Sequence, residues 1–318
     1  MSHFIVRGRS FMAQLWRASA PLTAVALAML PVLAACLLGL WLDPRSIAGA
    51  PAWLKPAKFA ASISLYALTL AWVFQYLPER TRLRRGVGWT SAGVFVLEIA
   101  IIIVQAARGQ LSHFNTGTLL DGTLFTIMGA SILLQTFASA AVAVALWRQK
   151  FADRALGWSL RLGLGLAVVG ASFGGLMTRP TQEQLDAMRS GPPSVVGAHT
   201  VGAPDGGPGL PGTGWSREHG DVRVPHFVGL HALQALPLLA LGLRRRRYSE
   251  PRRVRLVVSA AVSYASLVAL LLWQALRGQA LFAPDVTTAV ALLGWLALSL
   301  GLAWQALAGE RQRAAYAS

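Results

Sequence analysis

The chain has 318 residues, of which 54% are hydrophobic and only 13% charged, and its formal net charge is +16. Soluble domains average about 25% charged residues, so this composition excludes an ordinary soluble protein. The basic residues cluster in short segments between apolar stretches, a placement that orients membrane proteins. We therefore expect a lipid bilayer, and no nucleic acid, around this chain.

Eight apolar stretches are long enough to cross a hydrocarbon core of about 30 Å. They predict an all-α fold, a polytopic membrane protein with a bundle of eight transmembrane helices. The predicted spans are 20–42, 57–77, 88–107, 124–147, 157–177, 225–243, 254–276 and 285–307. The corresponding parts of the chain are an N-terminus (1–19), a first membrane part (20–177), an external loop (178–224), a second membrane part (225–307) and a tail (308–318).

The lysines and arginines test this topology. Segments 78–87, 148–161 and 244–255, together with the two ends, hold 20 of them, and the opposite side holds 9. Because basic residues are retained in the cytoplasm, both termini are predicted to be cytoplasmic, in an inner membrane of the bacterial type.

Cys36 is the only cysteine, so the chain has neither an intrachain disulfide nor a metal site built from cysteines. The sequence LAAC that ends at Cys36 has the form of a lipoprotein cleavage site. The apolar run continues past it, however, which favours an ordinary transmembrane helix over a cleaved and lipidated signal peptide.

The external loop 178–224 is the least regular part of the sequence. Residues 191–220 include nine glycines and five prolines, which is typical of a flexible linker. The loop also carries side chains that a spacer does not need, namely His199, Asp205, Trp215, His219 and Asp221. Because long loops are often lids or binding loops, we favour an ordered lid.

Two short similarities indicate an internal repeat. QAARGQ (105–110) ends the third span and QALRGQ (274–279) ends the seventh, four spans later. A weaker similarity joins KPAKFAAS (55–62) to VPHFVGLH (224–231), where the second and sixth spans begin. The matches suggest two four-helix halves in the same orientation, related by an axis along the membrane normal. Such short matches also arise by chance in alanine-rich sequence.

The histidines lie almost entirely on the outer side. They are candidate metal ligands, because imidazole is the commonest metal ligand in proteins. The outer five are His113, His199, His219, His226 and His231. His226 and His231 are five residues apart and do not share a narrow helix face, so one metal bound by both is awkward. An interfacial histidine can also simply cap a helix or bind a headgroup.

Two carboxylates are candidate catalytic residues. Glu98 is the only acidic residue near the middle of a predicted span, where a charge costs about 2.5–3.5 kcal/mol by the insertion scale for aspartate. This cost makes Glu98 a candidate proton acceptor, although a protonated glutamate can also serve only to tie helices together. Asp121 lies near His113 in the segment between the third and fourth spans, at 108–122.

Basic residues at the outer boundary run against the general charge bias. Lys58, Arg108 and Arg277 are candidate cofactor-binding residues, able to hold a carboxylate, a phosphate or a haem propionate. The common alternative is that such side chains extend toward lipid headgroups.

Three functions fit these features. The first is a redox component with haem b near the outer face, bound by neutral imidazoles. The second is a zinc-dependent hydrolase, with three ligands from His113, His226, His231, Asp121 or the loop, although HExxH spacing is missing. The third is a proton-coupled transporter of an anionic small molecule that uses Glu98.

A scaffold that assembles with other membrane proteins is the fourth alternative, in which the polar residues are only structural. The outward histidines favour haem or metal over a generic carrier.

Overall fold

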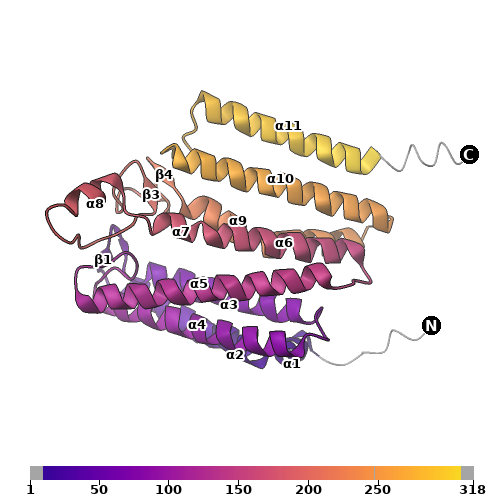
Figure 1. The fold of residues 1–318 in the computed structure, drawn as a ribbon, viewed down its shortest axis with the longest axis horizontal. Coiled ribbons are helices and arrows are strands. Elements are labelled where there is room, and N and C mark those ends of the chain that lie inside the picture. Colours follow the sequence, from indigo (N-terminus) through magenta and orange to yellow (C-terminus); the bar gives the residue numbers. More distant parts are fainter. Residues whose placement is uncertain (1–9, 247, 309–318) are drawn as a thin grey trace, which may run out of the picture. The chain divides into compact units, whose positions relative to one another are not determined.

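A computed structural model describes residues 10–246 and 248–308. Eight of its helices are long and apolar enough to cross a membrane, so the all-α, multi-pass prediction is confirmed. The predicted tail beyond residue 308 lies outside the described residues, as does His3. Figure 1 labels the elements. They are α1 (Phe11–Ala18), α2 (Ala20–Leu42), β1 (Ser46–Ile47), β2 (Ala50–Pro51), α3 (Leu54–Phe74), α4 (Thr81–Ala107), α5 (Leu119–Arg148), α6 (Arg154–Ser172), α7 (Gly174–Met177), α8 (Gln182–Ala187), β3 (Thr200–Val201), β4 (Gly220–Asp221), α9 (Arg223–Arg244), α10 (Glu250–Leu276) and α11 (Val286–Ala308).

The helices form two compact units. Unit 1 contains α1 to α4 and residues 123–145 of α5, and unit 2 contains residues 113–122 and the chain from Leu146 onward, with residues 48–50. In unit 1, α2 packs against α3 and α4, and the short helix α1 packs against α2 and α3.

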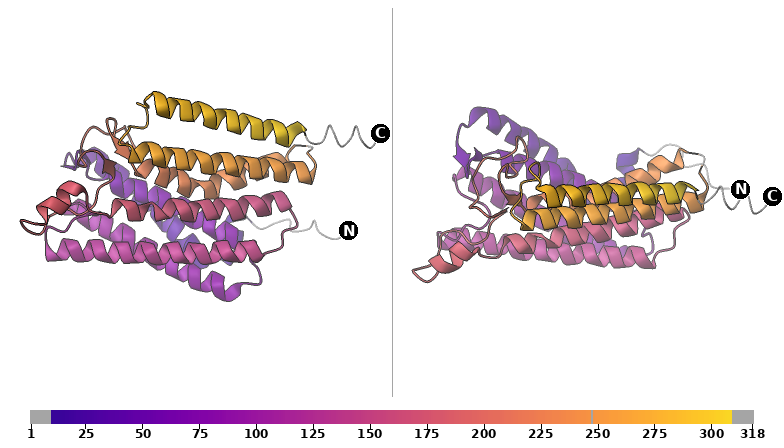
Figure 2. Two further views of the ribbon diagram at one scale, coloured as in Figure 1. Left: turned by 45° about the horizontal axis from the view of Figure 1, so that its top comes forward. Right: turned by 90° about the horizontal axis from the view of Figure 1, so that it is seen from above.

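In unit 2, α6 packs along α9, and α10 packs against α6, α9 and α11. Two views in Figure 2 show α10 and α11 side by side. The long segment between α7 and α9 contains α8 and the antiparallel pair β3–β4, in which Thr200 faces Asp221 and Val201 faces Gly220. These elements gather at one end of the helices of unit 2, as Figure 1 shows.

Helix boundaries repeat along the chain as the internal similarity predicts. The interval from the start of α3 at Leu54 to the start of α9 at Arg223 equals the interval from the start of α4 at Thr81 to that of α10 at Glu250. It also equals the interval between the two QAxRGQ sequences. The equal spacing supports a duplication of four helices, with the loop before α9 much longer than the loop before α3.

The QAxRGQ sequences themselves form the same turn in both units. Gly109 and Gly278 adopt φ of 70° and 75°, a left-handed conformation that favours glycine. Gln110 N–H donates to Gln105 O and Gln279 N–H donates to Gln274 O, which is the Schellman end of a helix. Each buried glutamine also donates from Nε2 to the carbonyl six residues ahead, at 3.2 Å and 2.8 Å. The repeated sequence is therefore a helix-ending device.

Six helices, α3 to α6, α9 and α10, begin earlier than hydropathy predicts, because polar first turns are still helical, and α3 to α5 show how. Pro56 lies in the first turn of α3, where proline is tolerated. The start of α4 at Thr81 includes the basic sequence that precedes the predicted span. Thr118 caps α5 by accepting from Asp121 N–H at 3.1 Å.

Candidate functional site

The segment between α7 and α9 is folded. Helix α8 begins with a capping box of Thr181 and Gln184. The Gln184 side chain also accepts from Gly197 N–H at 2.9 Å and donates to Gly197 O at 3.0 Å. Val196 N–H donates to Phe114 O at 2.8 Å. These bonds hold the segment as an ordered cap, which we define as residues 178–222.

His199 is fixed in the cap through both its ring and its backbone. Its Nδ1 lies 2.7 Å from Asp205 Oδ2, and its backbone N–H donates to both oxygens of that carboxylate. The ring of Phe114 lies 4.8 Å from the imidazole, centroid to centroid. Phe114 has φ of 65°, which is uncommon for a bulky residue and is held here by its contacts with the cap.

Asp205 binds His199 as an ionised carboxylate. Burial alone would raise the pKa of Asp205, but the hydrogen bond and charge of the His199 ring, with the N–H groups of His199 and Thr200, keep that pKa well below its usual range. The pKa of Asp205 is lower in the folded state than in the unfolded chain, so its ionisation stabilises the cap at pH values above about 3.9, the ordinary pKa of aspartate. This stabilisation is lost as the pH falls below that value.

We therefore expect Asp205→Asn to lower the stability of unit 2 by about 1–3 kcal/mol at neutral pH, since one charged acceptor of three hydrogen bonds is lost. The gap in melting temperature between wild type and variant should narrow below about pH 4. Asp186→Asn removes an exposed carboxylate of α8 and is the control. A gap that stays constant across this pH range would contradict the assignment.

The two histidines of α9 have separate partners. His226 Nδ1 lies 2.8 Å from Gly170 O of α6, and His231 Nδ1 lies 3.2 Å from Gln234 Oε1 on its own helix. Because these oxygens only accept, Nδ1 is the donor in each ring, and a neutral imidazole bonded in this way has its lone pair on Nε2. The ring of Phe227 lies 4.2 Å from that of His231.

The remaining predicted residues of this side are also engaged. His113 neighbours Phe114, with ring centroids 6.2 Å apart, and His219 N–H donates to Ser216 Oγ at 3.0 Å. Asp121 is buried and accepts from the Thr118 hydroxyl at 2.6 Å, in the first turn of α5. Within residues 10–246 and 248–308, no group of three or more His, Cys, Asp or Glu side chains is placed to hold a metal ion.

Glu98 lies in the interior of unit 1, with 1% of its surface exposed. Its Oε1 lies 2.6 Å from the Ser131 hydroxyl of α5, and its Oε2 has no hydrogen-bond partner among the described residues. Lys55 of α3 acts on the carboxyl group electrostatically. The sequence identified Glu98, but not Ser131 as its partner.

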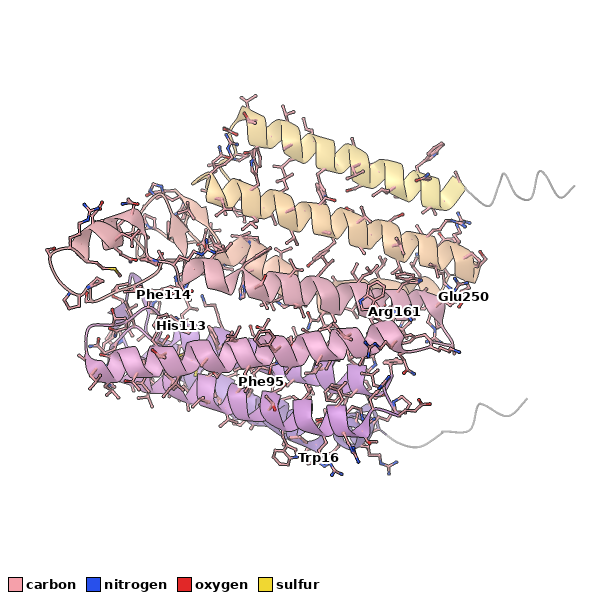
Figure 3. The ribbon with its side chains drawn as sticks, viewed as in Figure 1. Trp16, Phe95, His113, Phe114, Arg161 and Glu250 are labelled. Atoms are coloured by element: carbon pink, nitrogen blue, oxygen red, sulfur yellow. The ribbon has the colours of Figure 1, made fainter. Side chains whose placement is uncertain are left out.

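A polar stripe continues from Ser131 along α5. Ser131, Gln135 and Ser139 are spaced by four residues, so they share one helix face, and all three are buried. Ser139 Oγ lies 2.8 Å from Tyr66 Oη of α3, and Gln135 Nε2 donates to Ser139 Oγ at 3.2 Å. Figure 3 labels Phe95 of α4, whose ring meets that of Tyr66 edge-on. This spacing of four was the available signal for Ser131.

The boundary cations differ in their surroundings. Arg277 pairs with Asp285 at 2.7 Å, donates to Thr288 and lies over the Trp273 ring, so it ties the end of α10 to the start of α11. Arg108 donates to Gln105 Oε1 within the first helix-ending turn. Lys58 lies half-buried near the start of α3.

No protein-family model, curated protein or solved structure matches this chain.

Proposed function

We propose that this protein is a proton-coupled carrier in which Glu98 takes up and releases the proton. The observation that carries the proposal is the buried carboxyl group of Glu98, with one oxygen on Ser131 and the other without a partner. Ionisable residues inside a membrane are costly and usually mark ion pathways or proton relays.

The contact with Ser131 suits both protonation states of Glu98. The Ser131 hydroxyl is within hydrogen-bond distance of Glu98 Oε1 and also of Met128 O, at 2.9 Å. When Glu98 is ionised, the hydroxyl donates to the carboxylate. When Glu98 is protonated on Oε1, that group donates to Ser131 Oγ, and the serine hydrogen turns to Met128 O. Neither state leaves the serine hydroxyl unbonded.

The polar stripe of α5 supports a path for protons rather than a single hydrogen bond that joins two helices. Ser131, Gln135 and Ser139 extend over about two turns of α5, or ~12 Å at the usual rise per residue. Gln135 Oε1 is buried and, like Glu98 Oε2, has no partner among the described residues. Gln135 lies one turn along α5 from Ser131, the partner of Glu98, so these two unpaired acceptors favour a bridging water, which needs polar partners of this kind.

The cargo that we propose is an anionic small molecule. Lys58 and Arg108 belong to the same unit as Glu98 and supply positive charge on the side opposite the main basic segments. Proton uptake would offset the negative charge of such a cargo. The same charge bias supports a bacterial-type inner membrane with both termini in the cytoplasm.

Infrared difference spectroscopy of the reconstituted protein tests the role of Glu98. We expect the carbonyl band of a protonated carboxyl group that shifts in D₂O, weakens as the pH is raised and is missing in Glu98→Gln. Glu79→Gln, which changes an exposed carboxylate, should keep the band. A band that neither exchanges in D₂O nor titrates would identify a purely structural hydrogen bond and overturn the proposal.

A second candidate is a haem or metal centre on the outer side. It is favoured by the way that His199, His226 and His231 each use Nδ1 to bind an oxygen, which leaves Nε2 as the coordinating nitrogen. Haem b would be expected to give a Soret band that weakens in His226→Ala. Stoichiometric zinc without that band would favour the hydrolase, and purified protein with neither would rule out this candidate.

A further inference from the structure

A basic pocket lies in unit 1 where α1, the end of α3 and the start of α4 meet. The pocket has a volume of about 250 Å³ and is open to the surface. Two arginines and two glutamines line it, with one alanine, and no carboxylate is among them. The lining residues are Gln14, Arg17, Ala18, Gln75 and Arg84.

Two hydrogen-bond donors of this pocket lack acceptors. Gln75 Nε2 and Arg84 Nε are buried and have no partner among the described residues. Arg84 Nη1 donates to Phe74 O at 3.3 Å, which holds the guanidinium at the end of α3. Because an unpaired buried donor is costly, the pocket favours a ligand that brings acceptor oxygens. An anion satisfies both the charge and the hydrogen bonds.

The position of α1 indicates where that anion comes from. Leu15 is fully buried against the bundle, whereas Phe11, Met12 and Trp16 are 60%, 38% and 46% exposed. Figure 3 shows Trp16 directed away from the helices of unit 1. A short helix with apolar residues on its outer side is typical of the membrane interface, where tryptophan is enriched. A pocket beside such a helix would open at the depth of lipid headgroups.

We propose that this pocket binds a phosphate group, supplied by the headgroup of an anionic phospholipid. Arg84 and Arg17 donate hydrogen bonds to the phosphate oxygens, and Gln75 donates a further one. The exposed apolar residues of α1 contact the acyl chains. Basic pockets at the cytoplasmic side of membrane proteins bind such headgroups. The inference does not depend on Glu98, because none of the five lining residues belongs to the polar stripe.

Lipid binding to the full-length protein tests the proposal. Native mass spectrometry would count the phosphatidylglycerol molecules retained in detergent and measure their affinity, with phosphatidylcholine as the zwitterionic comparison. We expect about tenfold weaker phosphatidylglycerol binding in Arg17→Gln/Arg84→Gln, since charge-assisted hydrogen bonds are lost. The matched control is Arg82→Gln/Arg85→Gln, which removes the same charge from two exposed positions of the same segment.

Each outcome decides the proposal. Equal loss in both double variants would mean that only surface charge attracts lipid, and would overturn it. Inorganic phosphate that displaces the lipid at comparable concentration would assign the pocket to free phosphate instead. Arg84→Lys keeps the charge but not the planar donor fork, so a partial loss there supports a shaped site even where the double variant folds poorly.

Discussion

Proteoliposomes that contain Glu98→Gln are expected to lose proton uptake driven by anionic small molecules, down to the level of protein-free vesicles. The wild type should acidify the vesicle lumen when a transported carboxylate or phosphate is added outside, because each anion enters with a proton. Glutamine fills the same volume and still hydrogen-bonds Ser131 Oγ, but it cannot take up a proton. A pH-sensitive dye inside the vesicles measures the effect over a panel of such anions.

Two further variants separate proton transfer from folding in this experiment. Glu79→Gln alters an exposed carboxylate and should keep wild-type uptake. Ser131→Ala removes the partner of Glu98 but keeps the carboxyl group, so we expect slower uptake rather than none. Full uptake in Glu98→Gln, or no proton signal from the wild type with any anion of the panel, would contradict the carrier proposal.

The eight spans were predictable because hydropathy and length are local properties of the sequence. The same reasoning missed α1, since eight residues cannot cross a bilayer and Gln14 and Arg17 interrupt the apolar pattern. The repeated QAxRGQ sequence was recognised as a repeat, but not as a helix-ending turn. The glycine in this sequence was the signal for that conformation, because helices often end at a glycine with positive φ.

The site could be predicted only in part. The topology prediction put five histidines on one side of the membrane, but their partners depend on tertiary contacts, which no sequence pattern specifies. His226 bonds to a carbonyl of a different helix, and Asp205 meets His199 through the fold of a glycine- and proline-rich segment. The carboxyl of Glu98 was identifiable from its cost in the membrane, because that cost does not depend on which neighbour offers a hydroxyl.

Close packing of α6 and α9 is what brings Gly170 O to His226, and it depends on small residues. A Cβ atom added at Gly229 would lie 2.6 Å from Gly170 Cα, and one at Gly163 would lie 2.8 Å from Ala232 O. Backbone atoms cannot move aside as a flexible side chain can. Glycine and alanine at these positions let the two helices approach closely, as is common in membranes.

Gly229→Val is therefore expected to destabilise unit 2 by about 1–3 kcal/mol or more, because α6 and α9 must separate to admit the side chain. Thermal unfolding in detergent, followed by tryptophan fluorescence, measures the loss. Gly165→Val on α6 and Gly242→Val on α9 place the same side chain at positions with no atom within 4 Å of the added Cβ. These two variants carry the same propensity cost of valine in a helix, so only the contact between the helices distinguishes them. If all three variants lost stability equally, helix propensity would account for the effect. Close packing at Gly229 would then not be what brings His226 to Gly170 O.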